Sequence, residues 1–364
     1  MAPVVKTLSA VAGVQSLVCV TAQHRQMLDQ VLDLFGIRPD IDLNLMQPDQ
    51  SLAQLTSEIF RTLDPVLAQV RPDWVLVQGD TTTVMAAGLL AYYHRIRLGH
   101  VEAGLRTGDK WQPFPEEVNR RVTGVVADLH FAPTETSRKN LLKEGIEERR
   151  IHVTGNTVVD ALYDILKLEA PPVTQALLSE LGILSHDRML VLVTAHRREN
   201  FGKPLEDICQ AIRKLAERYH HRVQFLYPVH LNPNVQEPVN RLLAGIENVH
   251  RLPPQDYLPM VHLMRNAKLI LTDSGGIQEE ATALGVPTLV MRRVTERPEG
   301  VEAGSLMLVG TDPQKIYAET CRLLDHERDY QLMARAKNPY GDGHSAGRIV
   351  DLLLADADAN QEVH

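Results

Sequence analysis

The 364-residue sequence contains no run of 18 or more apolar residues, so it predicts no transmembrane helix. A basic stretch followed by an apolar one is also missing from its start, and we therefore expect no secretory signal. Basic residues are not in excess: the formal net charge is −8 and the sequence pI is about 6.0. This balance argues against non-specific binding of nucleic acid, so any basic pocket must be local.

Cysteine is scarce as well, with three residues in the whole chain. Cys19, Cys209 and Cys321 lie far apart and show no metal-ligand spacing, so we expect a reduced, cytoplasmic protein. Cys19 falls in an apolar, strand-like run and is expected to be a buried thiol. The 15 histidines include no HExxH motif, so neither a metal nor another cofactor is expected.

Short apolar runs of strand length alternate with helical patterns along nearly the whole chain. The predicted strands are Ser16–Thr21, Trp74–Gln78, Leu98–Val101, Leu129–Ala132, Ile151–Thr154, Met189–Thr194, Val223–Tyr227, Val249–Leu252, Lys268–Thr272, Thr288–Met291 and Leu306–Val309. Unbroken apolar strands separated by helices indicate parallel sheets that are covered on both faces. Eleven strands are too many for one compact sheet of this kind, so we predict two sheets.

The fold class is therefore α/β, with two Rossmann-like, doubly wound domains. The best boundary lies at Gly155, which gives domains at 1–155 and 156–344. One predicted helix, Ser51–Val70, has apolar residues at helical spacing and begins at Ser51, a good N-cap residue. Ligands of such sheets bind beyond the carboxyl ends of the strands, so two sheets are expected to face a common cleft.

The most informative stretch is Lys268–Glu280, in which an apolar strand runs through Asp-Ser-Gly-Gly into a helix. Gly275 and Gly276 allow a ligand to approach the backbone, and the helix N-terminus after Ser274 favours an anion such as a diphosphate. Glu280 lies one turn further along the same face and could accept hydrogen bonds from ribose hydroxyls. The alternative is a glycine-rich turn followed by an ordinary surface glutamate.

In the first half of the chain, three carboxylates follow strands or open a helix: Asp80, Glu102 and Glu116. Each also has a purely structural interpretation. Asp80 could cap the helix that follows it, Glu102 could pair with Arg106, and Glu116 could form an exposed ion pair with Arg120 four residues later.

The second half offers cations at strand ends. The sequence His196-Arg197-Arg198 follows one strand and suits an anion clamp, or else forms an exposed basic turn; Arg297 follows another strand. Carboxylates suit proton transfer at carbon and oxygen, whereas cations and helix ends stabilise a departing diphosphate.

Nine blocks in this order resemble the non-hydrolysing UDP-N-acetylglucosamine 2-epimerases, and the resemblance runs through nearly the whole chain. The blocks are Thr21–Arg25, Gly79–Thr83, Gly99–Thr107, Pro115–Arg120, Thr154–Thr157, His196–Asn200, Pro228–Pro233, Asp273–Glu280 and Thr295–Glu299. The resemblance implies a glycosyltransferase-B-like fold, in which a C-terminal helix at about 345–364 crosses back to the first domain.

The resemblance also implies a reaction, namely the reversible conversion of UDP-N-acetylglucosamine to UDP-N-acetylmannosamine. A base removes the C2 proton while UDP leaves C1, and UDP then adds back to 2-acetamidoglucal with C2 inverted. No nicotinamide or metal is required. The resemblance suggests a homodimer and does not say which cell-surface polysaccharide uses the product.

Site residues carry over position by position. Asp80, Glu102 and Glu116 match acid/base carboxylates, of which Glu102 or Glu116 is favoured for removing the C2 proton, and Arg120 and His196 match essential residues. The positions matching UDP contacts are Gln255, Met260, Ser274, Gly275, Gly276, Glu280 and Arg297. Bacterial members bind a second UDP-N-acetylglucosamine as activator, and the matching candidates are Gln23, Gln26, Arg197 and His230.

One departure concerns the first strand. Family members begin with a strand, then Gly-Thr-Arg-Pro-Glu and a lysine, whereas Met1–Lys6 matches the helix after that motif. Relative to the family pattern, the first strand and its Arg- and Lys-bearing loop are missing. Either the natural start lies upstream, which we favour, or this version is impaired. Impairment would leave a non-catalytic UDP-sugar binder. A hydrolysing relative that releases N-acetylmannosamine and UDP is another alternative. A glycosyltransferase of the same fold is less favoured, because sugar transfer needs fewer than three carboxylates.

Overall fold

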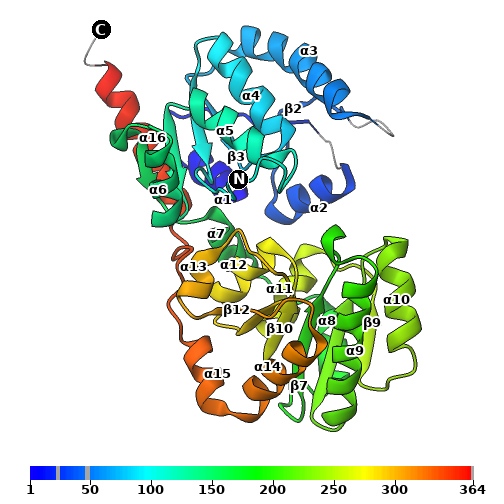
Figure 1. Ribbon diagram of the computed structural model, residues 1–364. Coiled ribbons are helices and arrows are strands. Elements are labelled where there is room, and N and C mark those ends of the chain that lie inside the picture. Colours follow the sequence, from blue (N-terminus) through cyan, green and yellow to red (C-terminus); the bar gives the residue numbers. More distant parts are fainter. Residues whose placement is uncertain (22–24, 46–49, 362–364) are drawn as a thin grey trace. The chain divides into compact units, whose positions relative to one another are not determined.

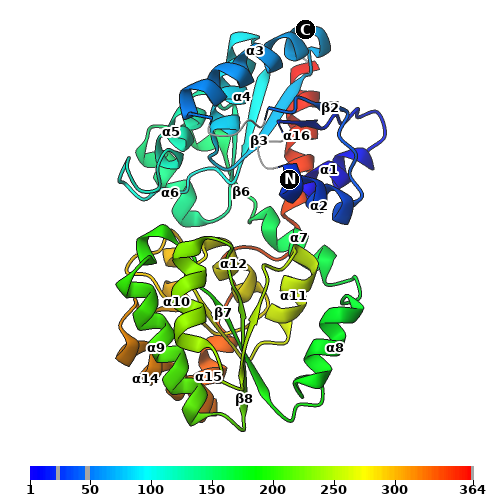
Figure 2. The same ribbon diagram turned by 90° about the vertical axis from the view of Figure 1, so that its right-hand side faces the viewer.

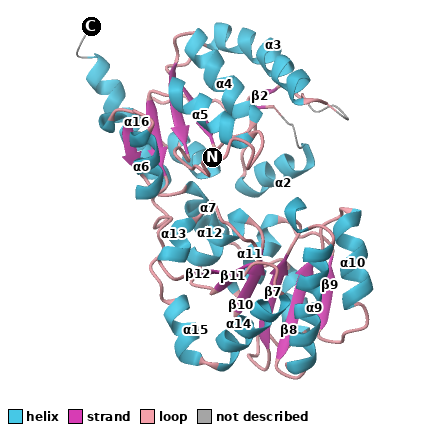
Figure 3. Ribbon diagram, in the orientation of Figure 1, coloured by secondary structure: helices cyan, strands magenta, loops and turns pink. Residues whose placement is uncertain are grey.

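The computed structural model describes residues 1–21, 25–45 and 50–361, and the chain divides into two compact units. Residues 1–161 together with 340–364 form unit 1, and residues 162–339 form unit 2. Figure 1 labels the elements of both units, and Figure 3 shows that each unit consists of strands flanked by helices. No described helix is long and apolar enough to cross a membrane.

Unit 1 contains two sheets. The larger is parallel, with strand order β3-β4-β5-β6, and the smaller pairs β1 with β2. Its elements are α1 (Ala2–Ser9), β1 (Cys19–Val20), α2 (Arg25–Phe35), β2 (Ile41–Asp42), α3 (Leu52–Val70), β3 (Trp74–Gln78), α4 (Thr82–Tyr93), β4 (Arg97–Val101), α5 (Glu116–Val126), β5 (Leu129–Ala132), α6 (Glu135–Lys143), the 3-10 helix η1 (Glu148–Arg150), β6 (Ile151–Val153) and α16 (Ser345–Gln361). Helix α7 (Thr157–Ile165) spans the division between the units.

The C-terminal helix α16 belongs to the core of unit 1. Its residues Ile349, Val350 and Leu353 pack with Val101 and Phe131 of strands β4 and β5. Helix α1 also contacts α16, and Figure 2 shows the two side by side. The helices α3, α4 and α5 form a separate apolar layer on the larger sheet.

Unit 2 is built on one parallel sheet with strand order β12-β11-β10-β7-β8-β9. Its elements are α8 (Pro172–Glu180), β7 (Met189–Thr194), η2 (Arg198–Asn200), α9 (Lys203–Arg218), β8 (Val223–Pro228), α10 (Pro233–Leu243), β9 (Val249–Leu252), α11 (Tyr257–Arg265), β10 (Leu269–Thr272), α12 (Gly275–Ala283), β11 (Thr288–Val290), α13 (Pro298–Glu302), β12 (Leu306–Leu308), α14 (Pro313–Asp325) and α15 (Glu327–Ala334). Strand order changes direction between β7 and β10, and this is the position at which doubly wound sheets bind ligands.

The predicted strands all appear, with ends that differ by a few residues. The prediction missed β2, which is only two residues long. The prediction for Cys19 was wrong: in β1 the side chain of Cys19 is exposed and that of Val20 is buried, because successive side chains of a strand point to opposite faces. Helix α3 does begin after Ser51, whose hydroxyl accepts from the N–H of Gln54 in a capping box.

Candidate functional site

The carboxyl ends of β3 and β4 in unit 1 bring Asp80 and Glu102 to one region. Gly79 has a φ of 81°, and a Cβ at this position would lie 3.4 Å from Glu102 Oε2. The His100 ring, buried and held neutral by a pKa lowered to about 4, hydrogen-bonds the Gly79 carbonyl at 2.8 Å. Burial is the main cause of that lowered pKa. The chain thus folds the loop after β3 against the loop after β4.

Glu102 has a left-handed backbone, with a φ of 62°. This region is unfavourable for residues other than glycine and costs of order 1–3 kcal/mol. The next residue, Ala103, donates its N–H to the Phe131 carbonyl at 3.1 Å, so the neighbouring strand β5 fixes the turn. A strained carboxylate at a strand end is typical of a functional position, because packing has to maintain its conformation.

Arg120 connects the loop after β3 with helix α5. Its Nε and Nη2 atoms donate to Asp80 Oδ2 at 2.9 and 2.7 Å, and its Nη1 donates to Glu117 Oε2 at 3.0 Å. The Arg120 and Glu117 side chains are 5% and 0% exposed, so both charges are removed from water. Glu117 also accepts from the N–H groups of Thr107 and Gly108, at 3.1 and 3.2 Å.

Glu116 precedes this pair in the first turn of α5, where the helix dipole favours a negative charge. Within the described part of the chain, its Oε2 is buried and has no hydrogen-bond partner. A buried carboxylate oxygen without a donor carries a desolvation cost, which a substrate hydrogen or hydroxyl would relieve.

Two of the structural alternatives for unit 1 do not match the contacts. Thr81, not Asp80, caps helix α4 by accepting from the N–H of Val84. The alternative ion pair between Glu102 and Arg106 does not form in the described structure, because Arg106 makes a bidentate pair with Glu144 at 2.9 and 2.8 Å. Asp80 and Glu102 therefore lack these two structural roles.

In unit 2 the chain turns from β10 through Asp273 and Ser274 into α12. Ser274 is the N-cap, and Gly275 and Gly276 are the first two helical residues. A Cβ on Gly276 would meet no atom within 4 Å, so the backbone here faces open space. The first N–H groups of a helix have no partners within it, and together with the positive end of the dipole they favour an anion.

Two arginines lie beside this turn. A Cβ on Gly275 would lie 2.9 Å from Nη1 of Arg297 and 3.6 Å from Nη2 of Arg197. Arg297 is oriented by the buried Glu279, which accepts from its Nε at 2.6 Å. Within the described residues, the Nε atom of Arg197 is buried without a hydrogen-bond partner. Arg197, a candidate for an activator site, is thus close to the proposed diphosphate turn.

Two candidate site residues of unit 2, His196 and His230, stack on one another. The rings of His196 and His230 are 5.5 Å apart with an angle of 11° between their planes. His230 accepts from the N–H of Asn232 on its Nδ1 at 3.0 Å, and Nδ1 of His196 lies 3.6 Å from Asp273 Oδ1. The essential and activator candidates at these positions are therefore neighbours.

Glu280 is almost fully buried in α12, and its Oε1 accepts from the Tyr257 hydroxyl at 2.7 Å. Burial raises the pKa of Glu280 to about 7, with the hydroxyl of Tyr257 opposing the shift and Glu279 adding to it. The alternative of an ordinary surface glutamate is therefore wrong. Burial and the Glu280 charge also raise the pKa of Tyr257 well above its usual value.

The remaining predicted residues are less informative. Gln255 donates from its Nε2 to the Pro253 carbonyl of its own loop, and Met260 lies half-buried in α11. Gln23 and the side chain of Gln26 lie outside the described residues.

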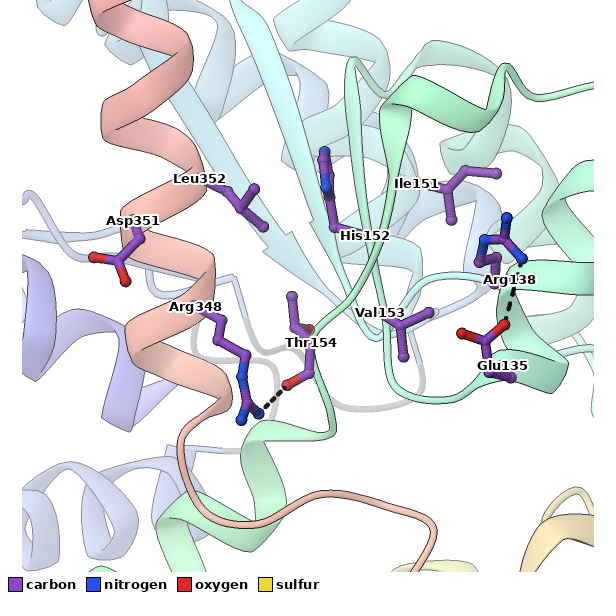
Figure 4. A pocket seen from close by; sticks show the side chains of 9 residues that line it. All are labelled: Glu135, Arg138, Ile151, His152, Val153, Thr154, Arg348, Asp351 and Leu352. Atoms are coloured by element: carbon purple, nitrogen blue, oxygen red, sulfur yellow. Dashed lines mark hydrogen bonds and ion pairs between the residues drawn. The ribbon is translucent and has the colours of Figure 1, made fainter.

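An open groove of about 490 Å³ lies elsewhere in unit 1, between α6, β6 and α16 (Figure 4). It is lined by Glu135, Arg138, Ile151, His152, Val153, Thr154, Arg348, Asp351 and Leu352. Its arginines already have partners, since Arg138 pairs with Glu148 and Arg348 pairs with Asp342. None of the predicted site residues lines it, so the strand ends are the better candidate site. Among the described residues, no three His, Cys, Asp or Glu side chains are grouped so as to hold a metal ion.

Comparison with known proteins decides the family. The sequence profile of the UDP-N-acetylglucosamine 2-epimerases matches residues 6–354. The chain belongs to the UDP-N-acetylglucosamine 2-epimerase family. The epimerase of Salmonella typhimurium is 56% identical over 97% of this chain and 94% of its own, and that of Escherichia coli K12 is 55% identical over the same shares.

Solved structures of the family agree with the fold. The Neisseria meningitidis UDP-GlcNAc 2-epimerase, bound to UDP-GlcNAc, has a TM-score of 0.91 at 48% identity and covers 98% of this chain and 96% of its own. The Methanocaldococcus jannaschii enzyme, in complex with UDP-GlcNAc and UDP, has a TM-score of 0.80 at 34% identity, with 97% and 95% covered. The chain thus has the glycosyltransferase-B-like α/β fold of these epimerases.

Three residues of this epimerase-family chain support the predicted site residues but were not predicted from the sequence: Glu117, Tyr257 and Asp273. Glu117 is three residues before Arg120 on one helical face, and this spacing could have indicated the pair. Asp273 lies inside the Asp-Ser-Gly-Gly block but had no role assigned. Tyr257 had no local signal, because its partner lies 23 residues away.

The raised pKa of Glu280 predicts how stability depends on pH. The folded protein holds the Glu280 proton up to about pH 7, whereas an unfolded glutamate releases it near 4.5. Its contribution is fully favourable below that lower value and is lost as the pH rises through about 7. Glu280→Gln should therefore be more stable than the wild type at pH 8, by up to roughly 3 kcal/mol, and similar at pH 4.5.

Urea unfolding at the two pH values measures this difference. Glu217→Gln, an exposed position on α9, serves as the control and should show no pH-dependent gain. An equal effect of Glu280→Gln at both pH values would contradict the assignment.

Proposed function

We propose that this chain interconverts UDP-N-acetylglucosamine and UDP-N-acetylmannosamine without net hydrolysis. In the forward step a carboxylate takes the C2 proton, the C–H electrons form the C1–C2 double bond, and UDP leaves with the C1–O electrons. UDP then adds back to C1 of 2-acetamidoglucal while C2 receives a proton on its opposite face. The family membership supports the substrate class, and the carboxylates of unit 1 support the proton transfers.

The observation that carries the proposal is the grouping of Asp80, Glu102, Glu116 and Arg120 in unit 1. Inversion at C2 needs proton-transfer groups for two faces of the sugar, and more than one carboxylate can supply them. Arg120 neutralises Asp80, so we assign the proton transfers to Glu102 and Glu116 and a supporting role to Asp80.

In unit 2 we assign the diphosphate to the turn at Ser274, Gly275 and Gly276, and the ribose hydroxyls to Glu280. Arg297 and His196 would stabilise the charge that develops on departing UDP. Gln255 and Met260 are proposed as further UDP contacts. The proposal includes no cofactor or metal ion.

The proposal has three further parts. A homodimer and a second UDP-N-acetylglucosamine as activator come from the family resemblance, and a cytoplasmic location comes from the sparse, widely spaced cysteines. His230 is exposed and stacks on His196. A ligand at His230 could therefore affect the neighbouring ring directly, which supports its place among the activator candidates.

The reaction is tested by incubating the protein with UDP-N-acetylglucosamine in heavy water and following the sugars by NMR. We expect UDP-N-acetylmannosamine with deuterium at C2, and deuterium in the recovered starting sugar. Accumulation of free N-acetylmannosamine and UDP would favour the hydrolysing alternative. Calorimetric binding of UDP without turnover or exchange would favour a non-catalytic binder.

Glu116→Gln should lower kcat by roughly 10²- to 10⁴-fold, the usual contribution of general acid–base catalysis. Its Kd for UDP should stay within about threefold of the wild type, because the assigned UDP contacts lie in unit 2. Steady-state kinetics and calorimetry measure the two quantities. Glu58→Gln, on the outer face of α3, is the matched control, and equal turnover in both variants would refute the role of Glu116.

Gly275→Ala should weaken UDP binding by about tenfold, equivalent to about 1.4 kcal/mol. The new methyl group would lie 2.9 Å from Nη1 of Arg297, closer than normal contact, so the guanidinium must move away from the turn. The control is Gly347→Ala in α16, where a Cβ meets no atom within 4 Å. Unchanged UDP affinity in Gly275→Ala, measured by calorimetry, would exclude the turn as the diphosphate site.

A further inference from the structure

Asp273 is a fully buried carboxylate at the end of β10 that the proposed reaction does not use. All its hydrogen bonds in the described structure fall on one oxygen. Oδ2 accepts from the N–H groups of His196 and Arg197, both at 2.8 Å, and from Nδ2 of Asn200 at 3.0 Å. Three donors compensate for the loss of hydration at this oxygen and fix the loop that follows β7.

The second oxygen of Asp273 has a different environment. Among the residues that the structure describes, Oδ1 is buried without a hydrogen-bond partner. The Nδ1 atom of the His196 ring lies 3.6 Å away. This separation is too long for a hydrogen bond, but a ring movement of less than 1 Å would close it. An unsatisfied buried carboxylate oxygen favours this movement, because it gains a donor.

The same loop fixes the orientation of the His196 ring. Its main-chain N–H is bound to Oδ2 of Asp273, and the His230 ring stacks on it almost in parallel. With Nδ1 directed at Asp273, the geometry of imidazole directs Nε2 away from the carboxylate. The side chain is 37% exposed, so this second nitrogen is open to a ligand.

We propose that Asp273 is a positioning residue that holds His196 in the tautomer with its proton on Nδ1. Oδ1 accepts that proton in a hydrogen bond, so Nε2 keeps its lone pair toward the nucleotide sugar. When UDP adds back to C1, Nε2 accepts the proton of its terminal phosphate, and the Asp273 charge stabilises the resulting imidazolium. In the opposite direction this imidazolium returns the proton to the phosphate as UDP departs. This inference rests on the proposed function, in which His196 acts on the departing UDP.

The protonation state of His196 makes its tautomer important. Burial lowers the pKa of His196; the Asp273 charge opposes this shift, and Arg197 and His230 add to it. This lowered pKa favours the neutral ring, in which only one of the two nitrogens can accept a proton. Which nitrogen this is depends on the group facing Nδ1.

The substitution Asp273→Asn separates positioning from loop anchoring. In the reversed orientation the asparagine NH₂ group would face the three N–H donors, and no hydrogen bond could form between them. These donors therefore orient the asparagine oxygen into the place of Oδ2. The NH₂ group then takes the place of Oδ1 and donates to Nδ1 of His196. The ring proton moves to Nε2, so we expect kcat to fall on the order of 100-fold or more. Asp187→Asn, an exposed position in the same unit, should keep wild-type turnover.

A double-substitution cycle with His196→Ala is the first test. If Asp273 acts through His196, Asp273→Asn should reduce turnover by less than about twofold in the His196→Ala background. A purely structural role would reduce turnover by the same factor in both backgrounds, and this result would overturn the proposal.

NMR of protein labelled with ¹⁵N-histidine is the second test. It does not depend on activity, and its measurement on the wild type does not depend on the variants' folding. The wild type should show a protonated Nδ1 and an unprotonated Nε2 for His196, and Asp273→Asn should show the reverse. A wild-type ring protonated on Nε2 would refute the inference. If His196→Ala left turnover unchanged, the role of His196 in the proposed function would fail, while the tautomer would still report on Asp273.

Discussion

Fully buried carboxylates hold the loops at the strand ends in both units. Glu117 accepts from the N–H groups of Thr107 and Gly108, and Asp273 accepts from those of His196 and Arg197. Loops beyond a parallel sheet have no ladder hydrogen bonds, so their donors need other acceptors. A carboxylate can serve several donors at once, and it thereby determines the path of the whole loop. Both loops lead to or contain candidate site residues, whose positions depend on these two side chains.

The two anchors differ in what else they bind. Glu117 pairs with Arg120, which in turn pairs with Asp80, so charge in unit 1 is balanced through a chain of contacts. Breaking a buried pair of this kind typically costs 3–5 kcal/mol, because one charge is left uncompensated. Asp273 instead faces the His196 ring, with Nδ1 3.6 Å from its Oδ1. Unit 1 thereby holds its carboxylates through paired charges, whereas in unit 2 Arg197 and Arg297 lie beside a helix N-terminus.

The sequence predicted most of the fold because strands buried on both faces are continuous apolar runs. It missed β2 and the exposure of Cys19, since a strand of two residues has no periodicity to detect. The alternatives for Asp80 and Glu102 could not be separated from sequence. For Asp80, the fold shows that Thr81 caps the helix and that Asp80 pairs with Arg120, 40 residues away; for Glu102, it shows that Arg106 pairs with Glu144, 38 residues away. Such pairs, like that of Tyr257 with Glu280, arise only when the chain folds.

The raised pKa of Glu280 has a calorimetric consequence. At pH 7 the carboxyl is only partly protonated, and ribose hydroxyls that donate to it would favour its ionised form, so a nucleotide bound there would expel a fraction of a proton per molecule into the medium. The buffer takes up that proton and adds its own heat of ionisation to the titration. The apparent enthalpy of UDP association would therefore differ between Tris and phosphate, even though the affinity at a given pH stayed the same.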